Sequence, residues 1–187
     1  MLAVGLSIAY VDRPVADYVQ SHLRHTALFR WTNRGLAPLP LVLVSAVLFL
    51  LTSGGFRLAG RALPTWTCTP LLCSWSAAWA LSATTVLKHV FGRISPDPYY
   101  VVQRIYELNL LHADPAHLAF PSGTISISGA ILIVLWLRHS RLRITITLIL
   151  AVLGLALVIT NSHWAADVIA GLFLGACIGR MTVPLLE

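Results

Sequence analysis

Three short clusters in the sequence hold the residues whose types and spacing could carry chemistry. The first cluster spans 88–96 and includes Lys88 and Arg93, the second spans 120–124, and the third spans 161–167. Each cluster adjoins the end of a long apolar run. Because ionisable side chains at membrane depth are costly, they are candidate functional residues. The order of the clusters predicts one site assembled from three helix ends.

In the third cluster, a histidine and an aspartate are four residues apart. On a helix this spacing places His163 and Asp167 on the same face. A carboxylate beside an imidazole sets its tautomer and stabilises its cationic form, which suits a histidine that acts as a nucleophile or a general base. A lone histidine at the start of a helix is more often structural, but an aspartate one turn later favours the catalytic interpretation.

The second cluster offers a binding place for an anion. Ser122, Gly123 and Thr124 begin an apolar run, so a hydroxyl and free backbone N–H groups meet at a predicted helix start, and helix N-termini favour phosphate. Lys88 and Arg93, at the end of the preceding run, could supply positive charge to the same anion. The alternatives are a simple N-cap for the serine and snorkelling of the two cations to the membrane surface.

The composition indicates that the bilayer covers much of this chain. The 187 residues are 57% hydrophobic and 11% charged, with a mean hydropathy of +0.79, whereas soluble domains carry roughly 25% charged residues. These values exclude a disordered chain, a fibrous repeat and a disulfide scaffold, and the three cysteines have no framework or metal spacing. The net charge of +6 comes from lysines and arginines scattered at the ends of apolar runs, which argues against nucleic-acid binding.

The apolar runs predict the elements that position the clusters. A spanning helix needs about 20 residues; five runs are candidates, and residues 1–10 form a sixth, shorter one. Residues 12–34 repeat apolar positions at helical spacing with interleaved arginines, which is typical of an amphipathic helix in the membrane interface, with a polar connection as the alternative. We therefore expect one all-α membrane domain over 1–187, a polytopic bundle of five to six transmembrane helices with an interfacial amphipathic helix. The five runs are 38–52, 68–91, 125–137, 144–160 and 164–186.

The charges on the loops predict the orientation of the bundle. If all five runs span, the loops at 54–67 and 138–143 and the C-terminus share one side. The charged residues of that side are Glu187 and six arginines, namely Arg57, Arg61, Arg138, Arg141, Arg143 and Arg180. The positive-inside rule places that side in the cytoplasm. The three clusters then face the periplasm or the exterior.

The last apolar run carries Gly171, Gly175 and Gly179, each four residues after the one before. Glycines at this spacing form a flat face that lets a neighbouring helix approach closely. The face could serve a homodimer or packing within the chain, and we favour packing within the chain.

The three clusters together resemble the signature of the type 2 phosphatidic acid phosphatase superfamily. The matching residues are Lys88 and Pro96, Pro121-Ser122-Gly123, and His163 with Asp167. The resemblance implies a six-helix membrane bundle that dephosphorylates lipid phosphates through a phosphohistidine intermediate, without a metal or other cofactor. It assigns phosphate binding to Lys88, Ser122 and the Gly123 backbone. It assigns nucleophilic attack to His163, with Asp167 as the residue that orients it.

Four positions depart from that signature. Ser95 stands in place of an arginine, Thr124 in place of the histidine that protonates the leaving group, and Ala156-Leu157 in place of Ser-Arg. Two phosphate-binding arginines and the general acid are therefore absent from their usual places. Arg93 and Arg104 are the candidates to bind phosphate instead.

A second, shorter resemblance concerns Arg93-x-Ser95-Pro96 followed by Arg104-Ile-x-Glu107-Leu108. This pattern is similar to that of the lipid A 1-diphosphate synthases, which move a phosphate from undecaprenyl diphosphate to lipid A on the periplasmic face. The two resemblances imply an integral protein of the bacterial inner membrane, with membrane lipids as partners. The implied activity is that of a lipid phosphatase or phosphotransferase acting on a lipid phosphate or diphosphate.

The missing acid at Thr124 has several explanations. General acid catalysis contributes roughly 10²–10⁴-fold, but a diphosphate substrate has a phosphate as leaving group and needs little protonation. Alternatively, His89, His112 or His117 supplies the proton, or the replacements are engineered. The alternative function is a catalytically degraded family member that binds or transports a phospholipid, although retention of the histidine–aspartate pair favours activity.

Overall fold

Helices make up almost all the regular structure of this chain. The computed structural model describes residues 2–60, 64–111 and 114–186, and within these ranges it contains no β-strand, only two isolated bridges at Arg93. The predicted all-α class is therefore confirmed. The main helices are α1 (Leu2–Leu6), α2 (Asp12–Tyr18), α3 (Ala27–Leu36), α4 (Leu39–Leu58), α5 (Cys68–Phe91), α6 (Val101–Gln103), α7 (Gly123–Arg138), α8 (Arg143–Ile159) and α9 (Ala165–Thr182).

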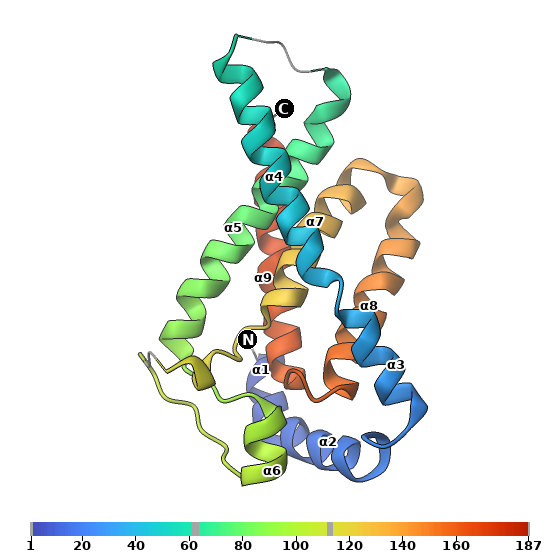
Figure 1. The fold of residues 1–187 in the computed structure, drawn as a ribbon, viewed down its shortest axis with the longest axis vertical. Helices are drawn as coiled ribbons and strands as arrows, with labels where there is room; N and C mark the ends of the chain where they lie inside the picture. The colour runs from blue at the N-terminus through green and yellow to red at the C-terminus, as the bar shows by residue number, and fades with distance from the viewer. Residues whose placement is uncertain (1, 61–63, 112–113, 187) are drawn as a thin grey trace.

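Five of these helices, α4, α5, α7, α8 and α9, form a bundle that runs mainly along the long axis of the molecule (Figure 1). Three helical segments are long and apolar enough to cross a membrane, namely Thr65–Phe91, Ser140–Ile159 and Ala165–Thr182. Two shorter apolar helices, Val44–Phe56 and Gly123–Arg138, accompany them. These helices indicate an integral membrane protein, while the number of five to six spans stays a prediction.

The glycine face of α9 packs against α7 within the same chain. A Cβ atom placed on Gly171 would lie 2.7 Å from the Ser122 carbonyl oxygen, and one on Gly175 would lie 2.4 Å from that of Ser126. Such distances are too short for any side chain, so glycine is required for this approach of the two backbones. The prediction that these glycines serve packing within the chain is confirmed. Because α7 covers it, the glycine face of α9 is not open to a second copy of the protein.

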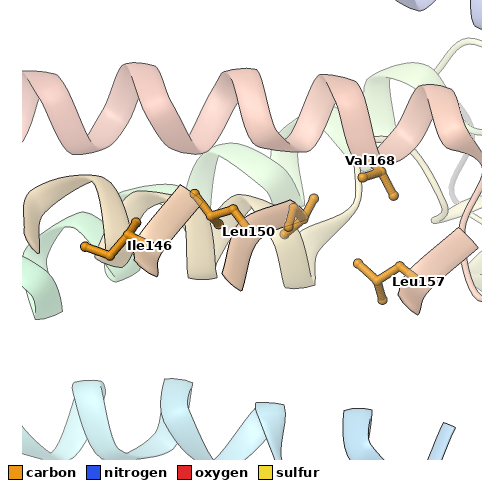
Figure 2. Packing of buried hydrophobic residues seen from close by; sticks show 5 residues of the cluster. Ile146, Leu150, Leu157 and Val168 are labelled. Carbon is orange, nitrogen blue, oxygen red and sulfur yellow. The ribbon is translucent and has the colours of Figure 1, made fainter. Parts of the chain in front are cut away.

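A second part of the core joins α8 to α7 and α9 through apolar side chains. Figure 2 shows this cluster, in which Ile146, Leu150 and Leu157 of α8 pack with Val168 of α9 and with Ile125 of α7. All five side chains are buried. Leu157, which stands where the superfamily signature has an arginine, is thus a core residue in this fold.

The N-terminal segment does not form one helix over residues 12–34. A helix with α- and π-helical turns runs from Leu2 to Leu23, and after a turn α3 begins, where the Thr26 hydroxyl accepts a hydrogen bond from the Phe29 N–H at 3.2 Å. The extended backbone of Thr26 (ψ 160°) is the reason for the break, because an N-cap residue leaves helical geometry. The interfacial position of this segment stays a prediction.

The two ends of the bundle carry different elements. At one end lie the adjoining ends of α4 and α5 together with the C-terminus, and at the other lie α2, α6 and the α8–α9 corner (Figure 1). This is the arrangement expected from the apolar runs. Arg61, part of the predicted basic side, lies outside the described residues.

Candidate active site

The three predicted clusters meet at the end of the bundle that carries α2 and α6. The N–H of Ser122, just before α7, donates to the carbonyl oxygen of Asp167 in the first turn of α9 at 3.1 Å. A Cβ atom placed on Gly123 would lie 3.9 Å from Nζ of Lys88, near the end of α5. Lys88 and Asp167 are close enough for their charges to interact. The ends of α5, α7 and α9 therefore converge, as the order of the clusters predicted.

His163 and Asp167 face each other at the start of α9. Nδ1 of His163 lies 3.8 Å from Oδ2 of Asp167, and the histidine side chain is 15% exposed while the aspartate is fully buried. Oδ2 also accepts a hydrogen bond from the N–H of Trp164 at 3.1 Å. Hydrogen bonds between catalytic groups are often long before substrate binds, so this geometry suits a histidine oriented by its carboxylate.

Two buried polar atoms at this meeting point have no hydrogen-bond partner among the described residues. They are the hydroxyl oxygen of Ser122 and Nδ1 of His163. Ser122 is the N-cap residue of α7, yet its side chain makes no capping bond. A buried polar group without a partner costs about 1–3 kcal/mol. A bound anion would give the Ser122 hydroxyl a partner, and Gly123 and Thr124 follow it in the first turn of α7.

Arg93 takes a position that differs from the predicted phosphate ligand. Its side chain is 1% exposed, and Nη1 donates to Oδ1 of Asp167 at 2.6 Å. Nη2 donates to Oδ2 of Asp12 at 2.5 Å and to the hydroxyl of Tyr106 at 2.9 Å. The guanidinium also lies over the ring of Trp164, 5.0 Å from its centroid. Arg93 therefore binds Asp167 and holds it in place. The sequence-based interpretation of Arg93 as a phosphate ligand is corrected accordingly.

The buried cation and its two carboxylates form a tightly coupled group. Burial lowers the pKa of Arg93, but the charge of Asp167 and the hydrogen bond that Arg93 donates to Asp12 outweigh this, so its pKa is raised above the ordinary value. Buried ion pairs are stable only when hydrogen bonds satisfy the remaining oxygens. Here the free oxygen of Asp12 accepts from the Ser7 hydroxyl at 2.9 Å and from the Ala166 N–H at 3.0 Å. Both oxygens of Asp12 and both oxygens of Asp167 therefore accept hydrogen bonds.

Asp12 is the residue of this site that the sequence analysis missed. The sequence predicts that Asp12 belongs to an amphipathic helix in the membrane interface, yet it is 1% exposed and accepts a hydrogen bond from the Ala166 N–H at the start of α9. The available signal was its place directly after the apolar residues 1–10. An acidic residue that borders an apolar helix needs a buried partner when that helix packs on the bundle.

Arg104, the other arginine predicted to bind phosphate, lies on the surface. It forms an ion pair with Asp17 of α2 and lies over the ring of Tyr100, and its side chain is 63% exposed. The hydrogen bond that Arg104 donates to Asp17 raises the pKa of Arg104. None of its contacts among the described residues reaches Lys88 or His163, so the structure does not bring Arg104 into the site.

The remaining candidates occupy other places. The hydroxyl of Ser95 donates to the carbonyl oxygen of Asp97 at 3.1 Å. Nδ1 of His89 lies 2.8 Å from the Thr85 carbonyl oxygen on the exposed side of α5. His117 is buried beside Glu107, with 3.5 Å between Nε2 and Oε2. His112 lies outside the described residues.

Comparison with known proteins agrees with this arrangement. Residues 69–187 match the PAP2 superfamily, and all three clusters lie within that range. A lipid A 1-phosphatase from Rhizobium etli is 26% identical over 149 residues, which cover 76% of this chain and 63% of that protein. This chain thus spans less than two thirds of the length of that relative. No solved structure matches the chain. Because the superfamily match covers well over half of the sequence, this protein belongs to the PAP2 superfamily.

Proposed function

We propose that this protein is a membrane lipid phosphatase or phosphotransferase in which His163 is the nucleophile. One observation carries the proposal: His163 faces Asp167 at the point where the buried Ser122 hydroxyl lacks a partner and Lys88 approaches. A nucleophile, its orienting carboxylate, a cation and a helix N-terminus are the parts that phosphoryl transfer through a covalent intermediate requires.

The phosphate of the substrate would lie at the start of α7. Lys88 supplies positive charge, the Ser122 hydroxyl donates a hydrogen bond, and the N–H groups of Gly123 and Thr124 point out of the first turn. These donors hold the phosphoryl oxygens and stabilise the charge that develops on them during transfer. They also place phosphorus beside the imidazole, which removes the entropic cost of the encounter.

The reaction would proceed in two displacements on phosphorus. In the first, Nε2 of His163 attacks, the N–P bond forms, and the bond to the leaving group breaks with its electron pair on the leaving oxygen. The N–H at Nδ1 donates to Asp167, which stabilises the cationic phosphohistidine. In the second, water or a lipid hydroxyl attacks phosphorus, releases its proton to solvent and frees His163.

The threonine at position 124 favours a diphosphate substrate. When a phosphate monoester is cleaved, the leaving group is an alkoxide, which must be protonated. When a diphosphate is cleaved, the leaving group is a phosphate, which is stable without a proton. We therefore propose a lipid with a phosphate or diphosphate headgroup, with undecaprenyl diphosphate and lipid A as candidates. Similarity to a protein named lipid A 1-phosphatase supports this lipid class.

We place the site on the periplasmic face of a bacterial inner membrane. The exposed arginines Arg138, Arg141 and Arg143 surround the α7–α8 turn, away from the site, and clusters of this kind remain in the cytoplasm. A phosphatase facing outward would meet lipids of the outer leaflet of that membrane.

The decisive experiment measures phosphate release and phosphoenzyme formation by the purified protein in lipid nanodiscs. The substrates are phosphatidic acid, lipid A and undecaprenyl diphosphate. Wild type should release phosphate from at least one of them, and His163→Ala should abolish both release and the acid-labile phosphoenzyme because the nucleophile is gone. His139→Ala, at the opposite turn and exposed, is the matched control and should keep full activity.

The second candidate function is lipid binding or transport without turnover. The observation that favours it is Leu157, an apolar core residue at a position where the signature has a phosphate-binding arginine. A wild type that binds all three lipids, releases no phosphate and binds equally well after His163→Ala would establish this function and exclude the enzyme.

A further inference from the structure

Asp12 is joined to Asp167 through buried hydrogen bonds to Arg93, and Asp167 in turn faces His163. Its Oδ2 accepts from Nη2 of Arg93 at 2.5 Å, Nη1 of Arg93 donates to Oδ1 of Asp167 at 2.6 Å, and Oδ2 of Asp167 lies 3.8 Å from Nδ1 of His163. These four residues come from the N-terminal helix, the segment after α5 and the start of α9. Apart from the partly exposed histidine, all of them are almost completely buried.

The second oxygen of Asp12 binds α9 directly. It accepts from the N–H of Ala166 at 3.0 Å, and Ser7 donates to the same oxygen at 2.9 Å. Ala166 precedes Asp167 by one residue, so this bond holds the first turn of the helix on which Asp167 lies. Asp12 therefore restrains Asp167 in two ways, through the side chain of Arg93 and through the backbone of α9.

The charges of the group explain why a second carboxylate is present. A single guanidinium bonded to Asp167 would neutralise it and weaken its attraction for a cationic imidazole. With Asp12 on the other side of Arg93, the three buried groups carry a net charge of −1 when both carboxylates are ionised. Charge interactions at such short distances in a buried site are strong.

We propose that Asp12 is a positioning residue for His163: it fixes Arg93 and the start of α9, and keeps negative charge on the side of Asp167 that faces the imidazole. This inference rests on the proposed function. The hydrogen bonds of Asp12 are with Ser7, Arg93 and the Ala166 N–H, and none of these groups is part of the proposed phosphate site. Asp12 therefore acts on the histidine and not on substrate binding.

The test compares Asp12→Asn with wild type and with Asp17→Asn, a matched control on the same helix whose carboxylate pairs with exposed Arg104. In Asp12→Asn, kcat should fall roughly 10-fold and by no more than about 100-fold, because outer-shell residues that orient the ligands of metal sites have effects of this size and Asp12 acts through two residues, Arg93 and Asp167. KM should stay within about twofold, since an orienting group of this kind makes no contact with substrate. In Asp17→Asn both constants should match wild type.

A spectroscopic measurement separates positioning from general stability. In protein labelled with ¹⁵N-histidine, the Nδ1 and Nε2 signals of His163, assigned with His163→Ala, should shift in Asp12→Asn and stay unchanged in Asp17→Asn. Unchanged signals, or a loss of kcat equal to the loss of folded protein, would overturn the proposal. If Asp12→Asn fails to fold, Ser7→Ala removes one bond to Asp12 and should give smaller changes of the same kind, and no shift there is equally decisive.

The two proposals fail in different ways. A wild type without turnover and without phosphoenzyme contradicts the proposed function. A wild type that forms the phosphoenzyme, with Asp12→Asn equal to it in kcat and in the His163 signals, contradicts only the role of Asp12.

Discussion

His163 faces Asp167 through Nδ1, and in the proposed mechanism Nε2 is the ring nitrogen that attacks phosphorus. In that mechanism the Nδ1–H donates to Asp167, and the lone pair lies on Nε2. The carboxylate is itself held at Oδ1 by Arg93 and at Oδ2 by the Trp164 N–H. Because both oxygens have partners before substrate arrives, little reorganisation is needed during the reaction.

At the residue scale, Thr124→His tests why the general acid is absent. The new imidazole would lie in the first turn of α7, beside Ser122 and Gly123. It should raise hydrolysis of phosphatidic acid by up to roughly 10²–10⁴-fold because the alkoxide leaving group needs a proton. Hydrolysis of undecaprenyl diphosphate should rise far less. The measurement is kcat/KM for both substrates.

The control for this prediction is Thr124→Gln, which adds length without a group that titrates near neutral pH. It should leave the ratio of the two kcat/KM values unchanged. Equal gains on both substrates with Thr124→His would contradict the leaving-group explanation and leave the assignment of His163 intact.

At the scale of elements, the contact between α7 and α9 sets the geometry of the site. The glycine face of α9 begins at Gly171, against the carbonyl oxygen of Ser122, and continues past Gly175 along α7. The same two helices carry the phosphate-binding turn and the histidine–aspartate pair. Close backbone packing here therefore determines how near Ser122 lies to His163.

Gly175→Ala should destabilise this contact. The new Cβ would lie 2.4 Å from the Ser126 carbonyl oxygen and 2.9 Å from the Ala130 nitrogen, both backbone atoms that cannot move alone. Overpacking of this kind costs about 1–3 kcal/mol. Thermal unfolding in detergent should show a lower midpoint than wild type.

Gly129→Ala is the matched control on the facing helix. Its Cβ would lie 3.7 Å from the Gly175 Cα, an ordinary van der Waals distance. Alanine favours a helix over glycine by about 1 kcal/mol, so this variant should be as stable as wild type or slightly more stable. An equal loss of stability in the two variants would contradict the assigned packing.

At the scale of the whole molecule, the N-terminal segment ties the site end together. Arg24 pairs with Asp97 at 3.4 Å, and the Asn161 side chain donates to the Ala16 carbonyl oxygen at 3.2 Å. These bonds join the first helices to the segment after α5 and to the α8–α9 corner, so residues distant in sequence depend on one another for their positions.

The proposed orientation can be measured by labelling single cysteines. In a chain without Cys68, Cys73 and Cys177, Leu110→Cys lies at the site end, where the leucine is 65% exposed. Ser140→Cys lies at the basic α7–α8 turn and is also exposed. A membrane-impermeant maleimide added outside spheroplasts should label position 110 and spare 140. The opposite pattern would place the site in the cytoplasm.

The proposed chemistry also predicts that turnover survives metal chelation. In the proposed mechanism, Lys88 and the N-terminus of α7 supply the positive charge that a metal provides in other phosphatases. Phosphate release should be equal with and without EDTA. Loss of activity with EDTA and recovery with a divalent ion would contradict this mechanism, whereas loss without recovery would indicate damage to the protein.

Local properties made a large part of this protein predictable. The length of an apolar run is a property of the local sequence and does not depend on tertiary contacts. The run at 68–91 predicts a helix, and α5 has the same bounds. Lys88, Ser122 and His163 adjoin the ends of such runs, so their convergence followed from alternating helix directions. The glycine spacing on α9 likewise predicts close packing against another helix, which is α7 in the structure.

The partners of the charged residues were decided by the tertiary structure alone. Arg93 and Asp12 are 81 positions apart, and nothing local distinguishes an arginine that binds phosphate from one that holds a carboxylate. Leu157 became a core residue because Val168 of the next helix packs against it. The strength of an ion pair depends on the distance between the two charges and on how far they are shielded from water. Both the distance and the burial are set only when the helices pack.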